Sequence, residues 1–142
     1  EASKVTAASG TATASVNVGF TVDQPPVAII DGDTTGTVSS PPAPYMCTIV
    51  LDCRRSYDPD GTIAACEWVF GSESPVRVPQ GPGQPTTVTH IEVVPGSGTA
   101  TLTVYDNGPN SSCPPMPASG PDNCATRQTA RQSVPFTCPP RP

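Results

Sequence analysis

Charged residues, aromatic residues and histidine are all scarce in this chain of 142 residues, and each shortage excludes a class of structure or function. Only 13% of the residues are charged, while 20 are proline and 12 are glycine, a composition that excludes long amphipathic helices. The single histidine, His90, lies among β-formers in THIEVV, and no Gly-x-Ser-x-Gly sequence accompanies it. We interpret His90 as an ordinary strand residue and predict that the chain is not an enzyme.

Basic residues and long apolar runs are also missing. Seven Lys and Arg stand against 12 Asp and Glu, and the basic residues are scattered, so we expect no nucleic-acid partner. No apolar run approaches the roughly 20 residues that a membrane helix needs, so we expect no membrane insertion. The chain starts at Glu1 without Met or a signal-like apolar region, which indicates a mature chain or an excised fragment.

Six cysteines are present, with no C-x-x-C pair among them. A single histidine and cysteines without C-x-x-C spacing do not provide the usual ligand pattern of a zinc site. An even number of cysteines is instead typical of disulfides formed in an oxidising compartment. We therefore expect an extracellular protein: secreted, on the cell surface or in the extracellular matrix.

Alternating hydrophobicity predicts strands over most of the chain. CTIVLDC places Cys47, Ile49, Leu51 and Cys53 on one face. The tryptophan strand presents a second apolar row, and two rows that face each other form a sandwich core. This second row and the later strands contribute Cys66, Trp68, Phe70, Ala100, Leu102, Val104, Val134, Phe136 and Cys138. VAII at 27–30 is expected to be a short strand, and 72–87 is expected to hold at most an edge strand.

We predict one β-sandwich domain over residues 25–138, interrupted by proline-rich inserts at 39–44 and 108–124. Residues 139–142 are expected to be a proline-rich linker to a following module. Residues 1–24 are expected to be an N-terminal strand or linker.

Three segments carry a family resemblance: PPVAIIDGDTT, LDCRRSYDPDGTIAACEWVFG and GTATLTVYDN. Together they resemble the PKD (polycystic kidney disease) domain over roughly residues 25–137. The resemblance implies an all-β fold, namely an immunoglobulin-like (PKD-like) two-sheet antiparallel β-sandwich of an extracellular protein, here stapled by disulfides. The family usually shows W-D-F-G-D-G, whereas this chain has Trp68, Val69, Phe70, Gly71, Ser72 and Glu73, without either aspartate.

The immunoglobulin-like strand order narrows the 15 possible disulfide pairings. Cys53 and Cys66 flank the DPDG turn on opposite sheets, and Cys47 and Cys138 lie at the other end, again on opposite sheets. Cys113 and Cys124 then close the proline-rich insert. We expect the pairs Cys47–Cys138, Cys53–Cys66 and Cys113–Cys124.

The same topology brings two acidic turns to one end of the sandwich. Asp58 and Asp60 follow one strand, and Asp106 and Asn107 end another, so their oxygens are candidates for a weak calcium site. The alternative is that Asp-Pro-Asp-Gly is simply good turn chemistry. We expect no other cofactor.

Two kinds of glycosylation are indicated. Asn110-Ser111-Ser112 is an N-glycosylation sequon in an expected loop. The SPP and CPP clusters are similar to the hydroxyproline-bearing stretches of algal and plant wall glycoproteins, although they also suit a stiff spacer. The candidate prolines are Pro41, Pro42, Pro114, Pro115, Pro139 and Pro140.

A short internal repeat bears on function. TASVNVGFT at 13–21 and TARQSVPFT at 129–137 agree at five of nine positions, either by convergence of two similar strands or because modules recur in tandem. The segment with Val16, Val18, Phe20 and Val22 on one face is then the last strand of a preceding module or a strand donated to a neighbouring copy.

We therefore predict a non-catalytic structural or adhesive module, one unit of a head-to-tail tandem array or extracellular fibre. Its expected partners are neighbouring copies of the module and covalently attached glycans. The alternative is an accessory carbohydrate- or calcium-binding module of a secreted hydrolase. Only Tyr45, Tyr57 and Tyr105 are candidates for exposed sugar-stacking aromatics.

Overall fold

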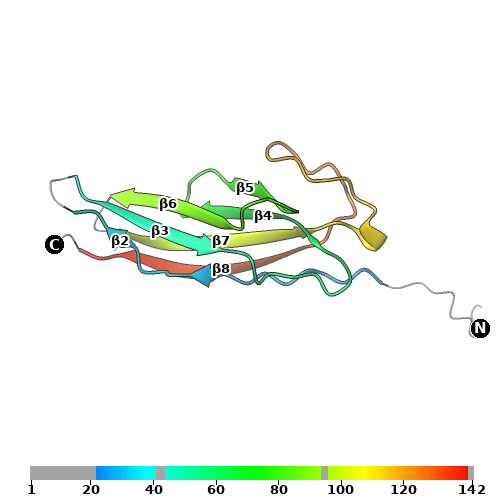
Figure 1. Cartoon of the computed structure of the whole chain (residues 1–142), viewed down its shortest axis with the longest axis horizontal. Coiled ribbons are helices and arrows are strands. Elements are labelled where there is room, and N and C mark those ends of the chain that lie inside the picture. The colour runs from blue at the N-terminus through cyan, green and yellow to red at the C-terminus, as the bar shows by residue number, and fades with distance from the viewer. Residues whose placement is uncertain (1–21, 41–43, 94–95, 141–142) are drawn as a thin grey trace, which may run out of the picture.

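The computed structural model describes residues 22–40, 44–93 and 96–140, and over these the chain forms two antiparallel sheets packed face to face (Figure 1). In the first sheet β3 (Met46–Asp52) pairs with β6 (Thr87–Val93) on one side and with the short β1 (Asp31–Gly32) and β2 (Thr37–Val38) on the other. The second sheet has the order β5 (Val76–Pro79), β4 (Ile63–Phe70), β7 (Gly96–Asp106) and β8 (Thr129–Cys138). The predicted β-sandwich is confirmed.

The inward rows of the alternating strands form the core. Ile49 and Leu51 of β3 are 0% exposed, and so are Leu102 and Val104 of β7. Trp68 of β4 lies between the two layers, where burial of each large apolar side chain contributes about 2 kcal/mol. The period of two seen in the sequence thus separates the inner face of each sheet from its outer face.

Disulfides join the sheets at two levels of the core. Cys47 pairs with Cys138, with their Cα atoms 5.8 Å apart, and Cys53 pairs with Cys66 at 6.7 Å. The third pair, Cys113–Cys124, closes the loop between β7 and β8 at 5.7 Å. These are the pairs expected from the strand order.

Two expected strands differ from the structure. VAII at 27–30 forms no strand: Val27 makes an isolated bridge to Tyr57, and β1 begins only at Asp31. The bridge forms because Val27 and Tyr57 exchange main-chain hydrogen bonds of 2.7 and 3.1 Å. Of the predicted assembly strand, Val16, Val18 and Phe20 lie outside the described residues, as do Pro41 and Pro42, and Val22 is 84% exposed and belongs to no strand.

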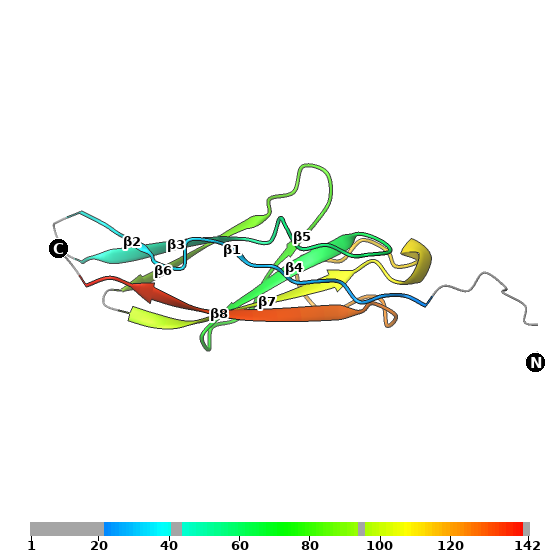
Figure 2. The same ribbon diagram turned by 90° about the horizontal axis from the view of Figure 1, so that it is seen from below.

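The described chain runs from one end of the molecule to the other. The described segment before β1 begins near one end of the long axis, and β8 runs toward the opposite end (Figures 1 and 2). We call these the N-terminal and C-terminal ends. In the part of the chain that the structure describes, no helix has the length and apolar character needed to cross a membrane.

Candidate functional site

Four carboxylates gather at the N-terminal end of the sandwich, and we call them the acidic cluster. Asp58 and Asp60 come from the turn between β3 and β4, Asp106 ends β7, and Asp23 lies on the segment that leads into the domain. The two turns that the sequence predicted to share one end therefore do meet. Asp23 was missed, because no strand pattern places the segment before Pro25 against these turns.

Asp106 is the most enclosed member, with 0% exposure. Its Oδ1 accepts hydrogen bonds from the main-chain nitrogens of Gly108 at 2.9 Å and Gln128 at 2.8 Å. Its Oδ2 is buried and finds no hydrogen-bond partner among the described residues. One oxygen thus orients the side chain, and the other is left for a proton or a cation.

Asp58 shows the same asymmetry, and Asp23 also has one unpaired oxygen. Asp58 is 9% exposed, its Oδ1 accepts a long hydrogen bond of 3.5 Å from the nitrogen of Asp60, and its Oδ2 is buried without a partner within the described chain. The Oδ2 of Asp23 is also buried and has no hydrogen-bond partner within the described chain. Buried carboxylate oxygens without partners are costly, so three of them at one end of the fold indicate a positively charged ligand or shared protons.

The electrostatics agree with this geometry. Burial, followed by the hydrogen bond and charge of Asp60, raises the pKa of Asp58 to about 6. Burial, followed by the charges of Asp106 and Asp60, also raises the pKa of Asp23. Carboxylates whose pKa values are raised by one another hold protons that a divalent cation can replace.

Gly61 allows the Asp58 and Asn107 side chains to lie close against the main chain of the turn. A Cβ atom at this position would lie 2.9 Å from Asp58 Oδ2 and 2.7 Å from Asn107 Oδ1, so a side chain here would displace both oxygens. Asn107 is partly engaged, since its Oδ1 accepts a long hydrogen bond of 3.4 Å from the nitrogen of Thr62 and its Nδ2 donates to Ser111 Oγ. The donor set is all oxygen, which suits calcium.

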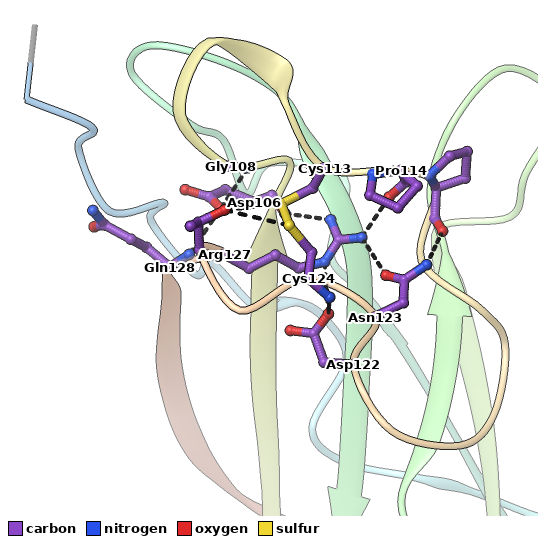
Figure 3. Close-up of a disulfide and its surroundings, with 11 residues drawn as sticks. Asp106, Gly108, Cys113, Pro114, Asp122, Asn123, Cys124, Arg127 and Gln128 are labelled. Atoms are coloured by element: carbon purple, nitrogen blue, oxygen red, sulfur yellow. Dashed lines mark hydrogen bonds and ion pairs between the residues drawn. A yellow bond between two sulfur atoms is a disulfide. The ribbon is translucent and has the colours of Figure 1, made fainter.

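The loop beside the acidic cluster is held by one buried arginine (Figure 3). The Arg127 side chain is 0% exposed, and its Nε donates to Asp122 Oδ1 at 2.8 Å. Its two terminal nitrogens donate to Asn123 Oδ1 and to the main-chain oxygens of Pro114 and Asp106. Together with the Cys113–Cys124 disulfide, these bonds hold the proline-rich insert at 108–124. A lone arginine just after the insert gave no sequence signal of this role.

The segment leading into the domain is tied to the same region. Gln128 Nε2 donates to the main-chain oxygen of Asp23 at 2.8 Å, and the nitrogen of Gln24 donates to Asp60 Oδ2 at 2.7 Å. Both bonds hold Asp23 beside the other carboxylates.

The candidate glycosylation positions in the described chain lie mostly on the surface. Asn110 is exposed in the short 3-10 turn η1 (Pro109–Ser111), with φ of 53°. Pro114, Pro115 and Pro140 are exposed, and Pro139 is half-buried.

The three tyrosines offer little for sugar stacking. Tyr57 is 51% exposed, whereas Tyr45 is half-buried. The Tyr105 hydroxyl donates to Glu67 Oε1 at 2.8 Å, and the guanidinium of Arg77 lies 5.7 Å from its ring. A surface hollow of about 310 Å³ runs from the start of β4 to the proline-rich insert, but no aromatic side chain lines it.

A family model described as PKD domain matches residues 30–114. No curated protein matches the chain.

Proposed function

Because the chain belongs to the PKD domain family, we propose that it is a non-catalytic structural or adhesive module of a secreted or cell-surface protein. We place it as one unit of a head-to-tail tandem array or extracellular fibre. PKD domains are typically extracellular and generally non-catalytic, and three disulfides suit an oxidising compartment.

The observation that carries this proposal is the path of the chain. The described residues begin at one end of the long axis and finish at the other (Figure 2). A module with this path carries tension along its own length and sets a fixed distance between its neighbours. Copies joined through their ends form a linear assembly. Disulfides near both ends of the sandwich resist unravelling when the line is pulled.

The short repeat supports recurrence of the module. In β8, Phe136 is 2% exposed and Val134 packs against the core. Val18 and Phe20 occupy the equivalent positions of the segment at 13–21. That segment therefore carries the apolar pattern needed to fill the place of β8 in a preceding module.

A donated strand is the other route to the same assembly. Within the described residues β6 pairs only with β3, so its outer edge is available for a strand from a neighbouring copy. Glycans on Asn110 and on the exposed prolines would lie toward the two ends of each module. Intact mass before and after enzymatic deglycosylation measures their occupancy.

Electron microscopy of the native material tests the assembly. We expect filaments with a regular axial repeat of one module, and isolated globules beside a larger domain would contradict the proposal. A denaturing, non-reducing gel then separates the two routes: a covalent array runs as one very large species, whereas a strand-donated fibre falls apart into chains of module size. Removal of residues 1–24 should abolish only the strand-donated fibre.

A second function, calcium binding, is favoured by the three unpaired oxygens of the acidic cluster. Asp23 Oδ2, Asp58 Oδ2 and Asp106 Oδ2 would be the carboxylate ligands, drawn closer together by the ion than they lie in the described structure, and main-chain carbonyls or waters would complete the six to eight that calcium takes. Because Asp23 belongs to the segment leading into the domain, a bound ion would stiffen the junction with whatever precedes it. The carbohydrate-binding alternative is weaker, since the hollow beside β4 lacks aromatic side chains.

Calorimetric titration with calcium tests this second function. Heat at one site per chain, together with a rise in melting temperature, is the expected result. Absence of both at millimolar calcium would leave the acidic residues as turn formers only, without affecting the assembly proposal.

A further inference from the structure

A second cluster of titratable side chains joins the two sheets away from the acidic cluster. His90 and Glu92 lie on β6 of the first sheet, two residues apart and therefore on the same face. Glu73 lies in the turn between β4 and β5 of the second sheet. One nitrogen of His90 and one oxygen from each glutamate lie within 4.8 Å of one another.

The imidazole of His90 is held firmly in place. Its side chain is 6% exposed and stacks on the ring of Phe70, with the ring centroids 4.2 Å apart and the planes 2° from parallel. The edge of a second ring, Phe136, packs against it at 5.5 Å. Both ring nitrogens consequently point in fixed directions.

One of these nitrogens has a clear partner. His90 Nε2 lies 2.8 Å from Glu92 Oε1. A carboxylate only accepts hydrogen bonds, so Nε2 carries the proton. In a neutral imidazole Nδ1 is then the acceptor, with its lone pair free.

The other nitrogen faces a second acceptor. His90 Nδ1 lies 3.7 Å from Glu73 Oε1, beyond hydrogen-bond distance and with nothing to donate. A lone pair that faces a carboxylate is unfavourable, and either a second proton on the imidazole or a cation between the two atoms removes this repulsion. For zinc in tetrahedral geometry, bonds of about 2.0 to 2.2 Å place two ligand atoms roughly 3.4 Å apart, close to the separation seen here.

We propose that His90 Nδ1 and the Glu73 carboxylate bind a divalent transition-metal ion of the zinc type, with Glu92 as the residue that positions the imidazole. The arrangement Glu92–His90–metal matches the way in which metal-ligating histidines donate their other N–H to a carboxylate. One nitrogen and one carboxylate ligand suit zinc or copper better than calcium, which takes oxygen. Glu73 has 58% side-chain exposure, so water completes the coordination and the ion enters from solvent.

The ion would link a turn of one sheet to a strand of the other. This site is independent of the acidic cluster, since it lies on other elements and uses a nitrogen ligand. It is also independent of the assembly proposal, because it requires only a single chain.

The single histidine gives a direct test by ¹⁵N NMR of the imidazole during titration with zinc at pH 7.5. We expect the Nδ1 resonance to shift on metal binding while Nε2 keeps the signature of a protonated nitrogen. Because only His90 contributes, zinc bound to the acidic cluster cannot produce this shift.

Variants on the exposed turn keep the core intact. Glu73→Gln removes a ligand charge and should weaken zinc binding at least about tenfold by calorimetry. Glu92→Gln still accepts from Nε2 and should weaken binding by less. Asp33→Asn, an exposed carboxylate on another turn, is the matched control and should leave the zinc affinity unchanged.

Two outcomes would overturn the proposal. Either both ¹⁵N resonances stay in place at millimolar zinc, or Glu73→Gln binds zinc as tightly as the unmodified chain. In either case the three side chains form only an ion-paired link between the sheets.

Discussion

The guanidinium of Arg127 donates a hydrogen bond of 2.8 Å to the main-chain oxygen of Asp106, the most enclosed member of the acidic cluster. The Asp106 side chain in turn accepts from the nitrogens of Gly108 and Gln128, on either side of the disulfide-closed insert. The insert at 108–124 and the candidate calcium site are therefore parts of one hydrogen-bonded unit (Figure 3).

Replacement of Arg127 by Gln should destabilise the fold by about 3 kcal/mol, because several buried acceptors lose their donor together. Arg127→Lys should cost nearly as much, since an ammonium lacks the planar fork that reaches acceptors in different directions. Urea unfolding measures both. Arg131→Gln, at an exposed position of β8, is the control, and a loss below about 1 kcal/mol for Arg127→Gln would show that the disulfide alone holds the insert.

The stability of the calcium-free protein should depend on pH through Asp58. Its pKa is about 6 in the folded chain, against about 4 for an unperturbed aspartate. The folded state therefore retains a proton that the unfolded state has lost between these values, so stability falls as pH rises through 6. Melting in chelator should occur at a higher temperature at pH 5 than at pH 7.

Two observations check this assignment. Asp58→Asn should flatten the pH dependence, because it removes the titrating group. Calcium should stabilise the protein more at pH 7 than at pH 5, because the ion competes with protons for the same oxygens. A melting temperature that rises steadily from pH 5 to pH 7 in chelator would contradict the assignment.

Asp23→Asn should weaken calcium binding at least about tenfold, because it removes one charge from the ligand set. Asp33→Asn should have no effect. Limited proteolysis provides a second measurement: calcium should protect the chain around residues 22–26 in the unmodified protein and not in the variant. Equal protection in both would place Asp23 outside the site.

Gly61→Ala should also abolish calcium binding while it leaves the fold intact. The added methyl group would fall between Asp58 Oδ2 and Asn107 Oδ1, and Asn107 can turn aside toward solvent. Calorimetry checks binding, and circular dichroism checks the fold. Thr62→Ala, in the same turn as Gly61, is the control. Gly81→Ala would serve less well, because Gly81 has a φ of 147°, which residues with a side chain rarely adopt.

Removal of the Cys47–Cys138 disulfide should destabilise the fold more than removal of Cys53–Cys66. The first pair is separated by 91 residues and the second by 13, so the chain-entropy model gives about 4.6 and about 3 kcal/mol. Both pairs are buried, and double replacement by Ala leaves a similar cavity in each case. Urea unfolding of the two variants therefore isolates the effect of loop length, and equal losses would contradict the entropic explanation.

The sequence by itself determined the sandwich, because alternation at a period of two records which side chains face the core. It also determined the disulfide pairs expected from the strand order, and the meeting of the DPDG turn with the end of β7. These features depend on local pattern and on topology, and a family resemblance supplied the topology.

Only the tertiary structure decided which distant polar groups lie together. Asp23 joins the acidic cluster across a proline-containing segment without strand pattern, and Arg127 reaches four acceptors between Asp106 and Asn123. The sequence predicts only an ordinary strand residue at His90, yet its ring lies between two sheets and beside two carboxylates. Such contacts depend on side-chain direction and on the packing of segments remote in sequence. Neither of these produces a periodic pattern in the amino-acid sequence.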